Sequence, residues 1–206
     1  MIVDLHAHES LYSACSRMTL EEAVSSARSG GLHGLCITDH DSLSIRDHEY
    51  LRGLDFPVFI GVEMYTREGD IIALGLDVLP PPRPGAQEFI DFAVARGAFC
   101  FAAHPFRAWG GGLGERLYSL RNLHGVEVLN GANSDAENHE AMEACAALGL
   151  IPVGASDAHV PEAVGRYATW FPEDLSSVRE LAEALKAGLG RPVIRKKDNS
   201  YEFFCL

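Results

Sequence analysis

Long apolar runs, paired cysteines and targeting segments are missing from this sequence. No apolar stretch reaches the roughly 18 residues that a membrane-spanning helix requires, and residues 1–5 lack the basic and apolar parts of a signal peptide. We therefore expect no membrane span and a cytoplasmic location. The cysteines are odd in number and none are closely spaced, so neither a disulfide framework nor a CxxC zinc site is expected. They are Cys15, Cys36, Cys100, Cys145 and Cys205.

Positive charge is also scarce. The 17 lysines and arginines are outnumbered by 29 aspartates and glutamates, which gives a net charge of -12. An acidic surface repels phosphate backbones, so long nucleic acid is an unfavourable partner, although bound divalent cations would reverse the field locally. With 206 residues, 47% of them hydrophobic, the chain can bury one sizeable core. No linker divides it, so we expect a single domain over residues 1–206; the sequence leaves the oligomeric state open.

Short apolar segments alternate with helical segments along the chain. A capping box at Thr19-Leu20-Glu21-Glu22 opens a helix that Gly30 and Gly31 end. Further helices are predicted at residues 86–96, 136–148 and 175–187. Strands are predicted at residues 2–5, 34–38, 58–62, 71–76, 98–103, 126–129, 151–155 and 167–171, with edge strands at 193–195 and 202–204. This order predicts a mostly parallel sheet, and it fits a small (β/α) barrel better than an open doubly wound sheet.

Ionisable residues gather where the predicted strands end. In a parallel barrel all strand C-termini lie on one face, where barrel enzymes keep their chemistry, so residues far apart in sequence would converge there. Imidazole and carboxylate together suit zinc, manganese or iron(II). The residues are His6 and His8 after the first strand, Asp39 and His40 after the second, Glu63 at the end of the third, His104 after the fourth, Glu127 and Asn130 in and after the fifth, and Asp157 and His159 after the sixth.

Each of these residues also has a simpler interpretation. The His6–His8 pair would suit the polar face of a strand, and Asp157 would suit the start of a short helix. Ligand-type residues at six consecutive strand ends are hard to explain by loop composition, so the joint pattern favours metals. The other histidines lie at the opposite strand ends or in predicted helices and are interpreted as solvated or structural: His33, His48, His124 and His139.

Three further features lie close to the predicted metal face. Arg107 follows His104 by three residues, where its guanidinium would either hold a phosphate with two hydrogen bonds or cap a surface loop. The glycine-rich run at 110–114 does not join a strand tightly to a helix, so it predicts a loop at the rim of the site rather than a dinucleotide fingerprint. Cys15 lies in a polar loop, whereas Cys36 and Cys100 lie in apolar runs typical of buried residues.

At these residues the sequence resembles the PHP (polymerase and histidinol phosphatase) family of metal-dependent phosphoesterases. The matching segments span residues 4–159 in the family's order, and the combination of HxH, TDHD and SDAH is specific. The resemblance implies an α/β fold, a distorted (β/α)7 TIM-like barrel, with two or three divalent ions of zinc, manganese or iron. The segments are Asp4-Leu-His-Ala-His8, Ile37-Thr-Asp-His-Asp41, Gly61-Val-Glu63, Ala103-His-Pro-Phe-Arg107, Glu127-Val-Leu-Asn130 and Ser156-Asp-Ala-His159.

The resemblance also implies how the ligands are shared among the metals. One residue would bridge the first and second metals, and a separate histidine pair would hold the third. By this assignment the first metal is bound by His6, His8, Glu63 and Asp157, the second by Glu63 and His104, and the third by His40 and His159.

Two positions depart from the family pattern. The loop after HxH offers Cys15 where a His or Asp is usual, so either a thiolate substitutes or the third site is weak. After the fifth strand, the candidates Asn130 and Asn133 stand where many members place a His or Cys. Neutral amides bind such metals poorly, so we expect one or both outer sites to be partly occupied.

The leading hypothesis for function is phosphomonoester hydrolysis by a metal-activated hydroxide, on a small phosphorylated substrate, a nucleotide or a short oligonucleotide. In this hypothesis Arg107 neutralises charge on the phosphoryl group, and His40 or His159 assists the leaving oxygen. Asp39 is expected to orient a histidine ligand. Two alternatives stay open: C–N hydrolysis of the amidohydrolase type, and a non-catalytic metal-binding domain. Specificity is expected to come from the loops at 64–70 and 106–118.

Overall fold

The core of the protein is a curled sheet, described here in a computed structural model for residues 1–204. Within that range the sheet has ten strands in the order β10-β9-β8-β1-β2-β3-β4-β5-β6-β7. Their residues agree with the predicted strands to within a few positions. The bounds are β1 Ile2–Asp4, β2 Gly34–Ile37, β3 Val58–Tyr65, β4 Asp70–Leu74, β5 Phe99–Ala102, β6 Gly125–Asn130, β7 Ile151–Ala155, β8 Tyr167–Trp170, β9 Arg191–Arg195 and β10 Tyr201–Phe203.

The strand directions correct one expectation. Four neighbouring pairs are parallel (β1–β2, β2–β3, β5–β6 and β6–β7), and the other five are antiparallel. The prediction of a mostly parallel sheet is therefore wrong for the pairings, because a β3–β4 hairpin interrupts the parallel run and the last three strands turn back and forth. The strands that carry the predicted ligands nevertheless all point the same way, since β4 is antiparallel to both β3 and β5.

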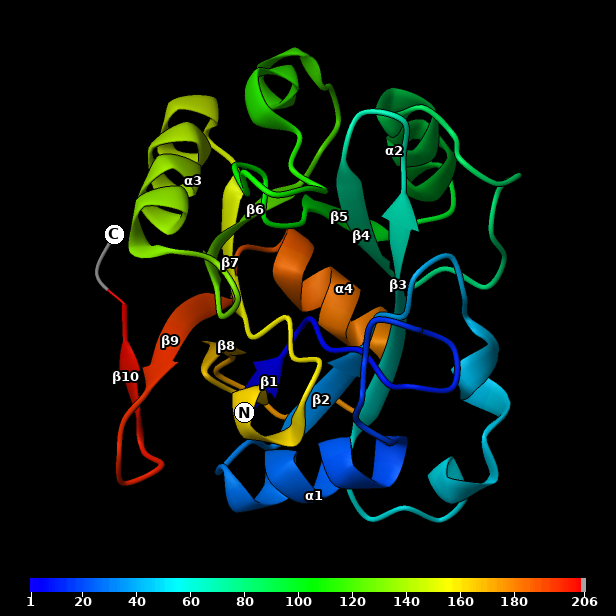
Figure 1. Cartoon of the computed structure of the whole chain (residues 1–206), viewed down its shortest axis with the longest axis vertical. Coiled ribbons are helices and arrows are strands. Elements are labelled where there is room, and N and C mark those ends of the chain that lie inside the picture. Colours follow the sequence, from blue (N-terminus) through cyan, green and yellow to red (C-terminus); the bar gives the residue numbers. More distant parts are fainter. Residues whose placement is uncertain (205–206) are drawn as a thin grey trace.

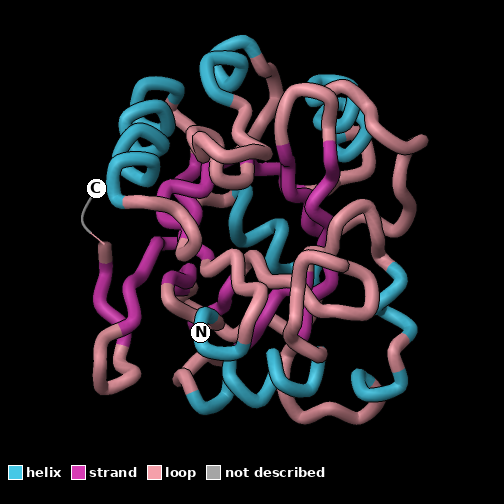
Figure 2. The backbone as a smooth tube through the Cα atoms, viewed as in Figure 1, coloured by secondary structure: helices cyan, strands magenta, loops and turns pink. Residues whose placement is uncertain are grey.

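Helices surround this sheet on the outside, as Figures 1 and 2 show for α1, α2 and α3. The first helix has the capping box predicted at Thr19 and Glu22 and ends at Gly30. The last helix begins later than predicted because the Ser177 hydroxyl accepts a hydrogen bond from the Glu180 amide and so fixes its N-terminus. The bounds are α1 Leu20–Ser29, α2 Ala86–Val94, α3 Asp135–Leu148 and α4 Val178–Lys186.

Helix α4 has a different place, across the middle of the ring of strands in Figure 1. Its buried face, Leu181, Ala182 and Leu185, packs with side chains of the inner sheet surface such as Phe99 and Phe101. These apolar residues fill one end of the interior. Polar side chains occupy the other end, at the carboxyl ends of β1, β2, β5 and β7, and this division positions the site.

The sheet curls so that β7, at one end of the strand order, meets β8 without a regular ladder. The hydroxyl of Thr169 in β8 donates to the carbonyl of Gly154 in β7 (2.9 Å) and accepts from the Gly154 amide (3.2 Å). Just beyond β1 and β7, Ala7 and Ala158 form a parallel bridge. The result is a mixed α/β fold with a barrel-like sheet, and the count of seven β/α units is not confirmed. No helix within residues 1–204 has the length and apolar character to cross a membrane.

Candidate metal centre

His6 and His8 lie at the centre of the polar end, directly after β1, and neither side chain is exposed to solvent. The Nδ1 atom of His6 lies 3.0 Å from Glu127 Oε1, and its Nε2 lies 3.0 Å from Nε2 of His8. A proton on Nδ1 that is donated to Glu127 leaves the lone pair of Nε2 directed at the centre of the cluster. Glu127 therefore sets the ligating form of His6.

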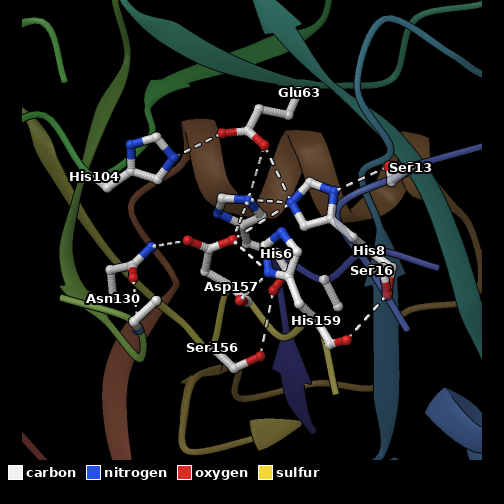
Figure 3. Close-up of polar contacts among 12 residues, drawn as sticks. His6, His8, Ser13, Ser16, Glu63, His104, Asn130, Ser156, Asp157 and His159 are labelled. Carbon is white, nitrogen blue, oxygen red and sulfur yellow. Dashed lines mark hydrogen bonds and ion pairs between the residues drawn. The ribbon is translucent and has the colours of Figure 1, made fainter. Parts of the chain in front are cut away.

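Glu63 in β3 contacts four imidazoles at once, and Figure 3 shows its contacts with His6, His8 and His104. Its Oε1 atom lies 2.8 Å from Nε2 of His104. Its Oε2 atom lies 3.1 Å from His8 Nε2, 3.2 Å from His40 Nδ1 and 3.3 Å from His6 Nε2. One oxygen thus faces a single imidazole and the other faces three, which is the arrangement that a bridging carboxylate needs.

Backbone conformation directs two of the other predicted ligands inward. His104 and Asp157 have positive φ values of 30° and 53°, in the left-handed region that is rare for residues other than glycine. Such conformations cost about 1–3 kcal/mol each and gather at functional sites. In this fold they place His104 Nε2 beside Glu63, and Asp157 Oδ1 3.3 Å from His6 Nε2 and 3.4 Å from His8 Nε2.

The charges of the cluster perturb one another strongly. Burial alone would lower the pKa of His6, but Asp157, Glu127 and Glu63 raise it well above its ordinary value. Burial alone would likewise raise the pKa of Glu63, but the imidazoles of His6 and His104 hold it well below its usual range. At the rim, burial lowers the pKa of His40 to about 4. His40 is therefore neutral near pH 7, which is the form that binds a metal.

Asp70 is a further member of the cluster that the sequence interpretation missed. Glu63, Asp70 and His104 offer ligand atoms that all lie within 4.8 Å of one another. Burial, and then the negative charge of Glu63, raise the pKa of the Asp70 carboxyl to about 7. Asp70 is the first residue of β4, whose antiparallel direction brings its amino end to the face where β3 ends. A prediction from sequence that considers only the carboxyl ends of parallel strands therefore misses Asp70.

This donor set fits divalent cations. Imidazole and carboxylate donors meet in several overlapping groups with ligand atoms within 4.8 Å, a mixture that zinc, manganese and iron(II) accept. The buried ring nitrogens His40 Nδ1 and His104 Nδ1 have no hydrogen-bond partner within residues 1–204. In the same range Arg107 is the one buried lysine or arginine, so the carboxylates depend on the imidazoles or on bound cations for the rest of their charge balance.

Asp39 acts on the cluster through a serine. Its Oδ1 accepts hydrogen bonds from the Ser13 hydroxyl (2.7 Å) and the Glu9 amide (3.0 Å). Ser13 Oγ also lies 3.3 Å from Nδ1 of His8 and accepts from the His40 amide at 3.1 Å. The predicted orienting role of Asp39 is thus indirect, and Ser13 is the residue that touches the histidine.

Arg107 is held from several sides within the site. Its Nε donates to Asn133 Oδ1 and its Nη2 donates to Asn130 Oδ1, both at 3.0 Å. Nη2 also makes a buried ion pair with Asp157 Oδ2. The Nε–Nη2 edge is therefore engaged inside the protein, and only the Nη1 side remains for the predicted phosphate contact. The two asparagines bind this guanidinium, which explains why neutral amides occupy these positions.

A cavity of about 250 Å³ opens onto the cluster. Its walls come from the two loops expected to govern specificity, with Tyr65 on one side and Arg107, Trp109 and Gly111 on the other. Tyr65 stacks on His40 with a centroid distance of 4.1 Å, and Trp109 lies over the Arg107 guanidinium at 4.4 Å and is 73% exposed. The predicted glycine-rich loop is at the rim of the site, as expected. A larger cavity of about 700 Å³ beside α4 contains none of the predicted ligands.

The histidines set aside as structural do lie elsewhere. His33 Nδ1 accepts from the Ile2 amide, and His124 Nδ1 accepts from the Cys100 amide. His48 caps a short helical turn, and His139 faces Glu143 on the surface of α3. Cys36, Cys100 and Cys145 are buried, whereas Cys15 is exposed beside the cavity; Cys205 lies outside the described residues.

Comparison with known proteins identifies relatives of this chain. A model of the PHP_C family, described as PHP-associated, matches residues 135–189, which include Asp157 and His159. The uncharacterized protein MJ1587 of Methanocaldococcus jannaschii is 30% identical over 147 residues, covering 66% of this chain and 85% of that protein. Another protein of the same organism, MJ0417, is 31% identical over 201 residues, covering 90% of this chain and 79% of that protein. The chain belongs to the PHP family.

Several solved structures similar to this PHP protein are described as hydrolases. A two-domain Bacteroides vulgatus protein, described as containing a predicted PHP-like metal-dependent phosphoesterase, has a TM-score of 0.67 at 22% identity and covers 93% of this chain and 64% of its own. The lesion-specific endonuclease PfuEndoQ of Pyrococcus furiosus has a TM-score of 0.68 at 20% identity, covering 90% and 56%. An amidohydrolase of Chromobacterium violaceum has a TM-score of 0.65 at 20% identity, covering 96% and 99%. At these identities the likeness shows the fold.

Proposed function

We propose that this PHP protein is a metal-dependent phosphoesterase that hydrolyses a small phosphomonoester, a nucleotide or a short oligonucleotide. The observation that carries the proposal is the convergence of four imidazoles on the two oxygens of Glu63 at the floor of a cavity. The similar structures described as a phosphoesterase and an endonuclease support phosphate-ester chemistry on this fold.

The possible ligand atoms fall into four overlapping groups. Glu63 lies between two of them, which supports the predicted bridging role, and Asp70 supplies the second group with a carboxylate. Bound divalent cations would supply Lewis acidity and lower the pKa of a coordinated water. In this proposal the first metal is held by His6, His8, Glu63 and Asp157, the second by Glu63, Asp70 and His104, and the third by residues that include His40 and His159.

The protein's own side chains fix this arrangement before substrate arrives. Glu127 holds His6 through Nδ1, and its other carboxylate oxygen accepts from the His104 amide at 2.8 Å. Ser13 holds His8 from the opposite side. Such positioning is important because a displacement of ligands by about 1 Å lowers the rate of catalysis substantially.

The cavity sets the size and charge of the substrate. A volume of about 250 Å³ accepts a phosphoryl group and a small part of its substituent, but not a folded polymer. Arg107 lines this cavity, and its Nη1 side is the cation available to phosphoryl oxygens. We propose that the remainder of the substrate extends outward past Tyr65 and Trp109, and that a histidine at the rim, His40 or His159, assists the leaving oxygen.

The test is a substrate panel with matched variants. Protein loaded with zinc, manganese or iron(II) is assayed on p-nitrophenyl phosphate, nucleoside monophosphates, short oligonucleotides and a set of amides. We expect phosphate release that is lost in His8→Ala and kept in His139→Ala, which removes an exposed imidazole of α3. Hydrolysis of amides alone would instead support the amidohydrolase alternative. Bound metal with no turnover on any substrate would support a non-catalytic domain.

A further inference from the structure

Cys15 lies within a group of imidazoles at the mouth of the cavity. Its thiol and the ligand atoms of His8, His40 and His159 all fall within 4.8 Å of one another. His8 is fully buried, whereas Cys15 and His159 line the cavity. His40 Nδ1 is a buried nitrogen that lies 3.2 Å from Glu63 Oε2 but forms no hydrogen bond among the described residues, so this imidazole is open to a metal ion.

The loop that carries Cys15 is tied to the same histidines on both sides of the cysteine. Before it, buried Ser13 contacts the His8 ring and accepts from the His40 amide. After it, Ser16 Oγ lies 2.9 Å from the His8 carbonyl and 3.2 Å from the His159 carbonyl (Figure 3). The Arg17 amide adds a bond to the His159 carbonyl at 3.0 Å. The position of the thiol is thus set by contacts to the residues with which it would share a metal.

The first metal group competes for one of these imidazoles. His8 Nε2 faces Glu63 and Asp157, and Nδ1 faces Ser13, so both of its nitrogens are engaged. Among the described residues, His40 and His159 make such contacts through Nδ1 only, at Glu63 Oε2 (3.2 Å) and at the Asp157 carbonyl (2.9 Å). Cys15, His40 and His159 then remain as three protein ligands. Three ligands and one open position describe a catalytic rather than a structural zinc site.

We propose that Cys15 is a thiolate ligand of the third metal, together with His40 and His159, and that it makes this site select zinc or iron(II) over manganese. The inference rests on the proposed metal-dependent function. Soft thiolate ligands favour zinc and iron, whereas manganese prefers carboxylate, carbonyl and water oxygens. The chain would therefore hold chemically different metals: two in oxygen-rich groups around Glu63 and one on sulfur at the rim.

Cobalt substitution reads out the sulfur ligand directly. The full-length protein is stripped of metal with a chelator and reconstituted with Co²⁺. The near-ultraviolet absorption from thiolate-to-cobalt charge transfer is then recorded. We expect this band in the wild type and its loss in Cys15→Ser, with the visible bands of the other two sites unchanged and one equivalent less cobalt per chain. In the variant Cys15→Asp the third site should bind one equivalent of manganese. The same site of the wild type should not retain manganese. Absence of the charge-transfer band from fully loaded wild type would overturn the proposal.

Thiol protection is a second readout that needs no activity. In a Cys205→Ser background, the remaining cysteines other than Cys15 are buried in the native fold. We expect the Cys15 thiol to react with a disulfide reagent in the chelated protein and to be protected stoichiometrically by zinc. Equal reactivity with and without zinc would contradict the proposal. Hydrolysis without a cobalt–thiolate band would reject only the inference, whereas a band without turnover on any substrate would reject only the proposed phosphoesterase function.

Discussion

Gly111 offers a sharp test of how the loop after β5 supports the second metal group. Its φ of +77° lies in the left-handed region, and its carbonyl accepts a hydrogen bond from the Asp70 amide at 2.8 Å. A Cβ atom added here would overlap Asp70 Oδ2 and lie 2.9 Å from His104 Cε1. The substitution Gly111→Ala therefore strains the backbone and pushes a carboxylate ligand away from its partners.

The expected magnitude has two parts. The left-handed conformation costs an alanine roughly 1–2 kcal/mol, and forcing a methyl group into a packed site costs typically 1–3 kcal/mol more. Gly114→Ala is the matched control, because Gly114 is in the same loop with a φ of +55° and has no atom within 4 Å of the added Cβ. We expect a loss of about 2–5 kcal/mol for Gly111→Ala and only the first part, about 1–2 kcal/mol, for Gly114→Ala.

Two measurements decide the outcome. Urea unfolding of the chelated proteins gives the free energy of unfolding, and metal analysis of the reloaded proteins gives the equivalents bound per chain. Gly111→Ala should lose one equivalent because Asp70 is displaced, while Gly114→Ala should bind as many as the wild type. If both variants unfold alike and bind the same number of metals, the placement of Asp70 as a ligand against Gly111 is refuted.

Three further predictions concern other parts of the molecule. Thr169→Val removes both hydrogen bonds that join β7 to β8 and should cost about 1–3 kcal/mol in urea unfolding, since it leaves the Gly154 amide and carbonyl unpaired. Burial raises the pKa of Asp4 to about 6 from 3.8, so the folded state favours the protonated form and stability falls as pH rises from about 4 through 6. The advantage of wild type over Asp4→Asn should therefore shrink across that range by on the order of 3 kcal/mol. Chelation should lower the melting temperature at pH 7, because Glu63 and Asp157 lose their counter-charge, and a chelator that leaves it unchanged would contradict a metal-balanced cluster.

The strands and most of the cluster were predictable because both depend on local signals. Apolar runs bounded by turn residues marked the strands, and the capping box at Thr19 fixed the start of α1. Ligand-type residues at successive strand ends needed only the rule that parallel strands end on one face. That rule holds for β1, β2, β3, β5 and β7 even though more neighbouring pairs are antiparallel than parallel.

Pairing direction and side-chain partners were harder to predict because they depend on contacts distant in sequence. Asp70 belongs to a strand that reaches the site with its amino end, so its place follows from the β3–β4 hairpin and not from any motif. Ser13 and Ser16 are ordinary loop residues in the sequence, and only the fold brings them to His8 and His159. Their small hydroxyls carry no signal that separates them from other serines.

The amides of Asn130 and Asn133 and the carboxylate of Asp70 have a common electrostatic explanation. Arg107 places a buried guanidinium next to Asp157, and Asn130 and Asn133 turn their amide oxygens toward it. A histidine or a cysteine at those positions would bring a metal ion against this fixed cation, at a cost that the low dielectric of the interior makes large. Asp70 lies with Glu63 and His104, where a second carboxylate beside Glu63 needs a cation. The neutral amides at the end of β6 and in the turn after it, and the carboxylate on β4, therefore form one solution to the charge balance of the site.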